Sequence, residues 1–261
     1  MNRCKIKFLS VLVILGAVSF IVANLKREDA KKVHVTSIVS KTSAEQDVVS
    51  QENADKVFKI LDTGTGEIVI MSDREFMYGA LAYEVPPSFE MEALKAQAVA
   101  IYTYFCHYRE QPTKSADLNG ADFKADLSHG EFYLNDNLLH ERLGSNFDEN
   151  FKKIKDAVDS VYMQKLMLNG ETILAMYHSI SGGYTQNCKD VFVQDLPYLR
   201  SVPSPADKFA PGYQTFKQFT FDEFKDIVSA QLGVTLPDDK NTWIHVQEKS
   251  PTGLVMNLQI A

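Results

Sequence analysis

The sequence contains little cysteine and no dense cluster of positive charge, and each absence excludes a class of protein. Its 261 residues include three cysteines, Cys4, Cys106 and Cys188, which are too few for a disulfide framework. Cys4 precedes an apolar run and is expected on the other side of a membrane. Cys106 and Cys188 could pair, or both could be small buried hydrophobic residues, and we favour the second. The formal net charge is −7 and no Lys/Arg cluster marks a predicted surface, so no nucleic-acid partner is expected.

Long hydrophobic runs are also scarce, and one near the N-terminus stands out. Residues 8–25 are almost entirely apolar, and positive charges at Arg3, Lys5 and Lys7 precede them. This length is near the minimum for a bilayer span, and the leading charges favour a cytoplasmic N-terminus. The alternative is a cleaved signal peptide, but Ile21 stands where a cleavage site calls for a small residue. We therefore expect a single-pass anchor over residues 1–25, with the rest of the chain exported.

The remainder divides into a linker and one folded domain. Residues 26–55 are charged and rich in Ser, Thr, Ala and Val, without sustained apolar periodicity, which predicts a flexible linker. Residues 56–261 show no internal repeats and predict an α+β domain with a central long helix and β-hairpins. The first hairpin pairs residues 57–61 with 67–71 across a Thr-Gly-Thr-Gly turn.

Two helices separated by a Pro-Pro break follow this hairpin. Ser72 and Glu75 form a capping box that begins the first helix. Pro86 disfavours the α conformation at Val85, so this helix should end near Glu84. The long helix then begins after residue 88 and extends to about residue 109, with a buried stripe formed by Leu94, Ala98, Ile101 and Phe105.

The second half of the domain is less regular. Residues 110–150 show no clear element and form either an irregular functional loop or helices that the pattern does not place. The remaining patterns predict two helices, one at 151–161 and one that begins at a Thr220/Glu223 capping box and ends before Gly233. They also predict two pairs of strands. The first pair, 163–168 and 172–177, is joined by Asn169-Gly170, and the second pair is 243–247 and 254–260.

Glu84 is the candidate for acid–base chemistry. It is expected at a helix end beside Tyr83, Val85 and two prolines, a partly apolar setting that favours a protonated carboxyl. The alternative is an exposed helix-end glutamate. The Ser/Gly-rich residues 178–185 form a candidate binding loop, since glycine lets the backbone approach a ligand closely.

Two other chemistries have weaker support. A serine hydrolase would use Ser179 or Ser181, but neither lies in a Gly-x-Ser-x-Gly elbow. A metal site, as in a secreted metal-dependent hydrolase, would draw on the set His178, Cys188, Cys106, His107 and His129. These residues lack a recognised zinc spacing, so no metal and no other cofactor is expected.

Three motifs in order resemble one known family. Glu84-Val85-Pro86 followed by residues 92–100 resembles the signature of the stage II sporulation protein D family, and residues 178–185 and 197–205 match its later motifs. The resemblance covers roughly residues 67–207. It implies a membrane-anchored lytic transglycosylase that cleaves peptidoglycan during engulfment of the forespore. It also suggests an alternative, because a related group acts as enhancers of cell-wall amidases.

The resemblance also assigns roles to residues. Glu84 carries over as the acid and base that cleaves the bond between N-acetylmuramic acid (MurNAc) and N-acetylglucosamine (GlcNAc) and leaves a 1,6-anhydro end. Glu92 is the second choice for this role, although an i, i+3 pair with Lys95 is the simpler interpretation. The residues implied to bind glycan are Glu92, Lys95, Gln97, Tyr102, Ser179, Ser181, Gly182, Gly183, Tyr184 and Thr185.

The family context also implies a location and partners. The protein would lie in the mother-cell membrane, with its domain facing the forespore septum. Its partners would be glycan strands, an amidase-endopeptidase and a multi-spanning membrane protein of the engulfment machinery.

The sequence departs from the family pattern at several places. Tyr102 stands where the family usually has arginine, and Phe192 where it has tryptophan. Some relatives bind zinc through cysteines before the middle helix, whereas this chain has Phe123-Lys124-Ala125 and His129-Gly130. The family's C-terminal Arg- and Leu-rich segment is missing, which suggests a shortened chain. The substitution at Tyr102 and the short C-terminus support the alternative of a glycan-binding module that does not cleave and that activates a partner amidase.

Overall fold

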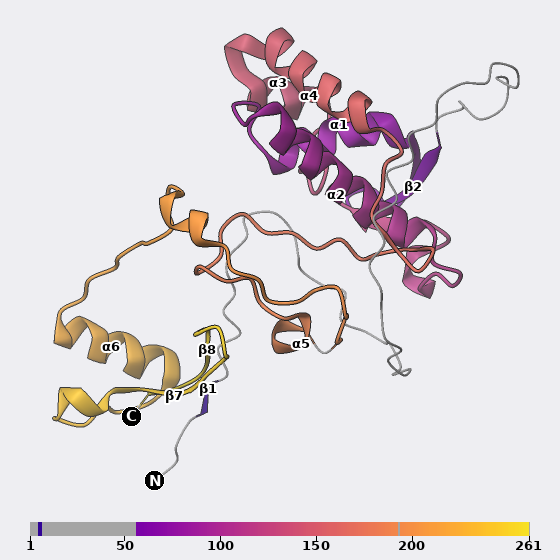
Figure 1. Ribbon diagram of the computed structural model, residues 1–261. Helices are drawn as coiled ribbons and strands as arrows, with labels where there is room; N and C mark the ends of the chain where they lie inside the picture. The colour runs from indigo at the N-terminus through magenta and orange to yellow at the C-terminus, as the bar shows by residue number, and fades with distance from the viewer. Residues whose placement is uncertain (1–4, 7–55, 193, 261) are drawn as a thin grey trace, which may run out of the picture. The chain divides into compact units, whose positions relative to one another are not determined.

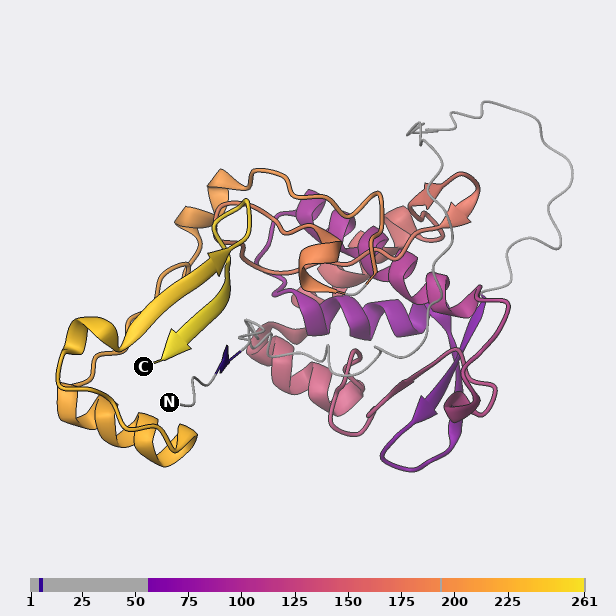
Figure 2. The same cartoon turned by 90° about the horizontal axis from the view of Figure 1, so that it is seen from below.

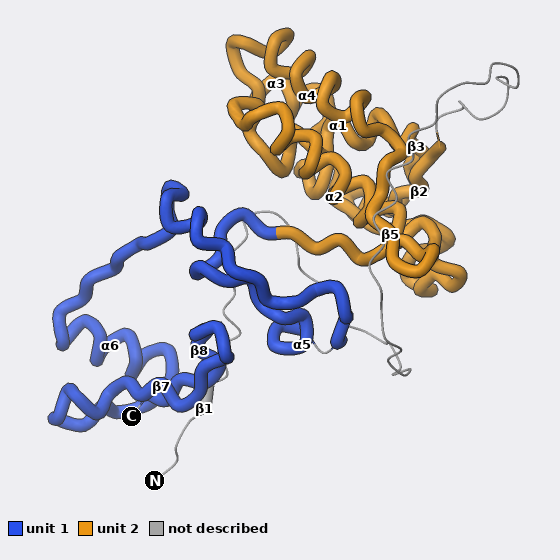
Figure 3. Tube along the Cα trace, in the orientation of Figure 1, with its two compact units in different colours: residues 1–14, 23–27, 178–261 blue, residues 15–22, 28–177 orange. Residues whose placement is uncertain are grey.

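The computed structural model describes residues 5–6, 56–192 and 194–260 (Figure 1). These residues form two compact units, one of residues 56–177 and one of residues 5–6, 178–192 and 194–260 (Figure 3). Helices and small sheets occur in both, so the α+β prediction is confirmed. The expected anchor and linker lie, apart from residues 5 and 6, outside the described residues. Within the described residues, no helix has the length and apolar character needed to cross a bilayer.

The first unit begins with the predicted hairpin. Strands β2 (Val57–Asp62) and β3 (Ile68–Ser72) are antiparallel, with Val57 opposite Ser72. A third strand, β4 (Phe123–Ala125), runs parallel to β2 and was not predicted. Figure 2 shows β2 and β3 as the indigo strands of this unit. Alternate residues of β2 point inward, which brings Phe58 and Ile60 into the core.

The next two helices follow the prediction closely. Helix α1 (Asp73–Glu84) begins at Ser72, whose side chain accepts a hydrogen bond from the backbone N–H of Glu75. It ends because Val85, before proline, is extended with φ −133° and ψ 142°. Helix α2 (Met91–Arg109) follows the break. The four residues of its expected apolar stripe are all buried: Leu94, Ala98, Ile101 and Phe105.

Residues 110–150 contain short elements that the sequence pattern did not place. These are two 3₁₀ turns, η1 (Ala116–Leu118) and η2 (Gly144–Asn146), strand β4, and helix α3 (Asp136–Leu143). Helix α4 (Phe147–Val161) then begins four residues before its predicted start. Gly79 of α1 lets this region pack closely, because a Cβ atom there would lie 2.4 Å from the ring of Tyr133.

Aromatic rings form the centre of this unit. Phe76 lies 5.3 Å from Phe58 and 4.7 Å from Phe105 between ring centroids, and both pairs meet edge to face. Such pairs add about 0.5–1.5 kcal/mol each beyond the burial of their area. Buried residues of helices α1, α2 and α4 and of the β2–β4 sheet join these rings in one core.

The hairpin around Asn169-Gly170 has the predicted turn but much shorter strands. Asn169 and Gly170 have φ values of 51° and 84°, as a two-residue hairpin turn requires. The paired strands are only β5 (Met167–Leu168) and β6 (Glu171–Thr172), so the expected long strands are wrong. A backbone group next to these strands bonds to helix α2 instead: the Leu166 N–H donates to Thr103 Oγ1 of α2 at 3.0 Å.

The second unit contains the C-terminal elements. Strand β1 (Lys5–Ile6) pairs with β8 (Val255–Ile260), which pairs with β7 (Ile244–Lys249). The other elements are α5 (Cys188–Val191), η3 (Pro205–Phe209), α6 (Phe221–Leu232) and η4 (Lys240–Thr242). The Thr220/Glu223 capping box and the two final strands are confirmed. A small core of Val228, Leu236, Trp243 and Ile260 stabilises this unit.

Candidate active site

Glu84 is the last residue of α1 and is partly buried. The hydroxyl of Tyr177 donates a hydrogen bond to Glu84 Oε1 at 3.0 Å. Burial raises the pKa of the Glu84 carboxyl, and the hydrogen bond from Tyr177 lowers it by less. The expected shift toward the protonated form is therefore confirmed.

Three tyrosines, Tyr83, Tyr104 and Tyr177, lie close enough to Glu84 for its charge to act on them. Burial, and then the nearby Glu84 charge, raise the pKa of the Tyr177 phenol well above its ordinary value. Burial also raises the pKa of Tyr83, with the Glu84 charge adding to it, and Tyr104 shows the same direction of shift. These phenols stay protonated at neutral pH, so they can donate hydrogen bonds to a carboxylate without adding charge.

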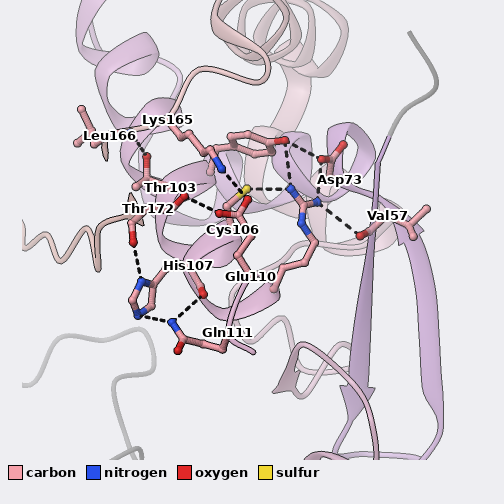
Figure 4. Close-up of polar contacts among 12 residues, drawn as sticks. Val57, Asp73, Thr103, Cys106, His107, Glu110, Gln111, Lys165, Leu166 and Thr172 are labelled. Atoms are coloured by element: carbon pink, nitrogen blue, oxygen red, sulfur yellow. Dashed lines mark hydrogen bonds and ion pairs between the residues drawn. The ribbon is translucent and has the colours of Figure 1, made fainter. Parts of the chain in front are cut away.

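Tyr177 was not identified from the sequence, although it directly precedes the candidate binding loop. Its position depends on contacts between α2 and the hairpin before it (Figure 4). His107 Nδ1 lies 2.9 Å from the carbonyl oxygen of Thr172. Glu110 accepts hydrogen bonds of 2.6 Å from both Lys165 Nζ and Thr172 Oγ1. These contacts fix the chain that leads to Tyr177.

A buried ion pair joins the start of α1 to the end of α2. Asp73 is fully buried, and its Oδ2 accepts hydrogen bonds from Arg109 Nη1 at 3.1 Å and Tyr102 Oη at 2.9 Å. Tyr162 Oη donates to the other carboxylate oxygen. The Arg109 guanidinium also lies 4.7 Å from the ring centroid of Phe58. The carboxylate thus has three donors, as a buried charge requires.

Tyr102 belongs to this network and not to an exposed surface. Its side chain is 4% exposed, and burial raises the pKa of its hydroxyl. Its hydroxyl is engaged by Asp73, so the structure gives Tyr102 a core position rather than access to a glycan. Cys106 lies in the same network, accepting from Arg109 Nη2 at 3.0 Å, and burial raises the pKa of its thiol to about 11.

Three predicted glycan-binding residues lie on the first half of α2. Lys95 Nζ and Glu92 Oε1 are 2.7 Å apart, which confirms the i, i+3 pair. The Glu92 side chain is 84% exposed. Gln97 differs, because its Nε2 is buried and has no hydrogen-bond partner among the described residues. Buried donors are nearly always bonded, so this amide nitrogen is an exception in the described part of the chain, and its burial keeps it out of reach of a ligand.

The loop of residues 178–185 belongs to the other unit, where internal hydrogen bonds fix its shape. Ser181 donates from its backbone N–H at 2.7 Å and its hydroxyl at 2.5 Å to Asp207 Oδ2. These bonds lower the pKa of the Asp207 carboxyl. The Gly183 N–H donates to Ser181 Oγ at 3.2 Å, and the Gly183 carbonyl accepts from Ser204 N. Ser181 therefore orients the loop, and Asp207, two residues after Ser204-Pro205, is a partner that the sequence interpretation missed.

The rest of the loop divides into engaged and exposed residues. Thr185 Oγ1 accepts from Val202 N at 2.9 Å, so this side chain is used internally. Gly183 has φ 101°, which favours glycine. His178, Ser179, Gly182 and Tyr184 are exposed, so a ligand can reach this part of the loop.

The candidate metal ligands are not gathered in one place. No three His, Cys, Asp or Glu side chains of residues 5–6, 56–192 and 194–260 are placed to hold a metal ion. His129 Nδ1 instead lies 2.8 Å from Asp126 Oδ2. Cys106 and Cys188 are both buried free thiols, in different units, as favoured from the sequence.

Comparison with known proteins points to one family. Residues 61–167 match the SpoIID family, described as stage II sporulation protein. The chain is 35% identical over 162 residues to "Stage II sporulation protein D" of Bacillus subtilis (strain 168), which is 62% of this chain and 46% of that protein. It is 34% identical over 158 residues to the protein of the same name from Bacillus amyloliquefaciens, which is 60% of this chain and 46% of that protein. It is also 31% identical over 121 residues to "Amidase enhancer" of Bacillus subtilis (strain 168), covering 46% of this chain and 14% of that protein.

These matches have a limited extent. The chain spans about half the length of the two sporulation proteins, 46% of each. The family match includes Glu84, Lys95 and Gln97 and ends before the loop of residues 178–185.

Proposed function

From the premise that this chain contains a domain of the stage II sporulation protein D family, we propose that it is a peptidoglycan lytic transglycosylase with Glu84 as its acid and base. The main support is one observation. Glu84 is a partly buried carboxyl with a raised pKa, and a neutral tyrosine donates a hydrogen bond to it. An acid that must give up a proton near neutral pH and then recover one requires such a setting.

The first step needs the protonated form of Glu84. Its carboxyl donates the proton to the oxygen that joins MurNAc C1 to GlcNAc C4. The C1–O bond breaks, GlcNAc leaves with a free 4-hydroxyl, and positive charge develops at C1. Glu84 is now a carboxylate, and the hydrogen bond from Tyr177 Oη stabilises that charge.

The second step returns the proton to Glu84. The carboxylate removes the proton of the muramoyl 6-hydroxyl while its oxygen bonds to C1, which closes the 1,6-anhydro ring. No water enters, and one carboxyl serves both steps, so a second carboxylate at the spacing of a glycoside hydrolase is not needed.

Substrate contacts are proposed for the exposed loop residues and for α2. The chain passes directly from Tyr177 to His178 and Ser179, so the tyrosine that bonds Glu84 adjoins the loop in sequence. Ser179, Gly182 and Tyr184 would contact the glycan, and Ser181 and Gly183 would keep the loop in shape. On α2, Gln97 would contact the glycan through the part of the residue that is exposed, and Lys95 would contribute positive charge.

Location and partners follow from the family context as part of the proposal. Residues 1–25 would anchor the protein in the mother-cell membrane with the domain facing the septum. An amidase-endopeptidase and a multi-spanning membrane protein would be its engulfment partners.

A second candidate function is a glycan-binding module that activates a cell-wall amidase without cleaving glycan. It is favoured by the similarity to a protein named amidase enhancer. The two functions differ in whether Glu84 is needed for chemistry, so one comparison separates them.

The test is mass spectrometry of purified peptidoglycan after incubation with the wild-type protein, Glu84→Gln, or the control Glu90→Gln. Glu90 is an exposed glutamate whose side chain makes no capping bond to α2. We expect anhydro-ended fragments from the wild type and the control, and none from Glu84→Gln. Binding of all three to peptidoglycan with no fragments from any would refute the transglycosylase and support the amidase activator.

A further inference from the structure

A cavity of about 510 Å³ lies within the unit that contains the loop of residues 178–185. Its volume falls in the range of about 300–1,000 Å³ that is typical of small-molecule sites. Its lining consists of Gly182, Gln186, Thr252, Gly253, Leu254, Val255 and Leu258. Glu84 is not among these residues and belongs to the other unit.

Hydrogen bonds tie the two sides of this cavity together. Gln186 Oε1 accepts from Thr252 Oγ1 at 2.6 Å and from Ser250 Oγ at 3.4 Å. Gln186 Nε2 donates to the carbonyl of Tyr184 at 3.3 Å. The Leu254 N–H donates to Ser250 Oγ at 3.0 Å. The turn before β8 is thus fixed to the loop, and the cavity wall is formed before a ligand arrives.

The chemistry of the lining restricts the ligand. None of the seven side chains is charged. A ligand with a carboxylate would lose hydration there without gaining a cationic partner, so a neutral ligand is favoured. Leu254, Val255 and Leu258 offer an apolar wall for methyl groups and C–H faces. The second N–H of the Gln186 amide, the remaining lone pair of the Thr252 hydroxyl and the Gly182 backbone offer polar partners, because the other hydrogen bonds of these two side chains are made within the protein.

An N-acetylated amino sugar has both of these properties without charge. Its acetamido methyl and ring C–H groups match the apolar wall, and its amide and hydroxyls match the polar groups. The stem peptides of peptidoglycan carry free carboxylates and fit less well. We propose that this cavity is a glycan subsite that binds GlcNAc residues of the strand. The inference rests on the proposed function, because it takes the same glycan as the substrate.

The test uses the full chain and a β-1,4-linked GlcNAc tetramer, which lacks the muramoyl residue that the proposed cleavage needs. Leu254→Trp fills the cavity, and Ile244→Trp is the matched control on β7. Ile244 is 48% exposed and is not part of the lining. Calorimetry measures affinity, and methyl NMR reports whether Leu254, Val255 and Leu258 contact the sugar. Thermal melting checks that each variant is folded.

We expect the tetramer to shift these three methyl signals in the wild type. We also expect Leu254→Trp to weaken binding at least tenfold and Ile244→Trp to leave it unchanged. Equal affinity in folded Leu254→Trp, no binding to the wild type, or methyl shifts caused by a stem peptide instead would each overturn the inference. Release of anhydro-ended fragments tests Glu84 separately, so failure of the subsite and failure of the transglycosylase give different results.

Discussion

Replacing Tyr177 by phenylalanine tests whether this tyrosine sets the acidity of Glu84. The change keeps the ring and removes the donor that lies 3.0 Å from Glu84 Oε1. That hydrogen bond lowers the pKa of Glu84, so its loss should raise the pKa further above the ordinary value. A hydrogen bond to a charged group contributes about 1.5–3 kcal/mol, and the lower end applies to this partly exposed carboxyl. One pKa unit corresponds to about 1.4 kcal/mol, so the expected rise is about one unit.

The effect should appear in the pH profile of anhydromuropeptide release. The first step needs protonated Glu84, so kcat/KM falls as the pH rises through its pKa. In Tyr177→Phe this limb should move about one unit toward higher pH. The maximal rate should fall about tenfold, because the carboxylate formed in the first step loses its donor.

Tyr78, a tyrosine on α1, provides the control. Tyr78 Oη donates a hydrogen bond to Asp159 at 2.7 Å. Among the described residues, Tyr78 and Glu84 are not joined by a hydrogen bond. Tyr78→Phe should therefore leave the limb in place. An unchanged limb in folded Tyr177→Phe, or a shift toward lower pH, would refute the role of Tyr177.

Two further predictions concern stability. Because the folded pKa of Glu84 is raised, its contribution to stability is greatest below the ordinary glutamate pKa and is lost as the pH rises through the folded value. Glu84→Gln should therefore melt at a higher temperature than the wild type at pH 7, and the difference should shrink below about pH 4. Equal melting temperatures at pH 7 would contradict this. Arg109→Leu leaves the buried Asp73 carboxylate without its cation, so it should reduce the free energy of unfolding, measured by urea titration, by about 3–5 kcal/mol. The double variant with Asp73→Asn should recover part of that loss, because the unpaired charge is removed as well. No recovery in the double variant would contradict the argument.

Local rules predicted much of the fold. The N-cap at Ser72 and the proline after Val85 fixed both ends of α1 to within a residue. The Asn169-Gly170 turn and the Thr220/Glu223 capping box were equally clear, because each depends on residues within one turn of the chain. Glu84 could be placed at a helix end for the same reason.

Features that depend on distant contacts escaped prediction. Strand β4 has three residues and pairs with β2 about 60 residues earlier in the sequence, so no periodic pattern marks it. The short strands β5 and β6 result from competition with α2 for backbone hydrogen bonds. Tyr177 and Asp207 act through partners 93 and 26 residues away, and no local pattern indicates either contact.

The position of Tyr102 bears on the choice between the two proposed functions. The tyrosine in place of the usual arginine favoured a binding module, since the chain would lack a charge near the substrate. Tyr102 is instead buried and donates to Asp73, and Arg109, two helical turns later, supplies the charge to the same carboxylate. The substitution therefore acts on the core that joins α1 to α2. It leaves Glu84 and Tyr177 with their hydrogen bond, so it gives no reason to expect that acid–base chemistry at Glu84 is lost.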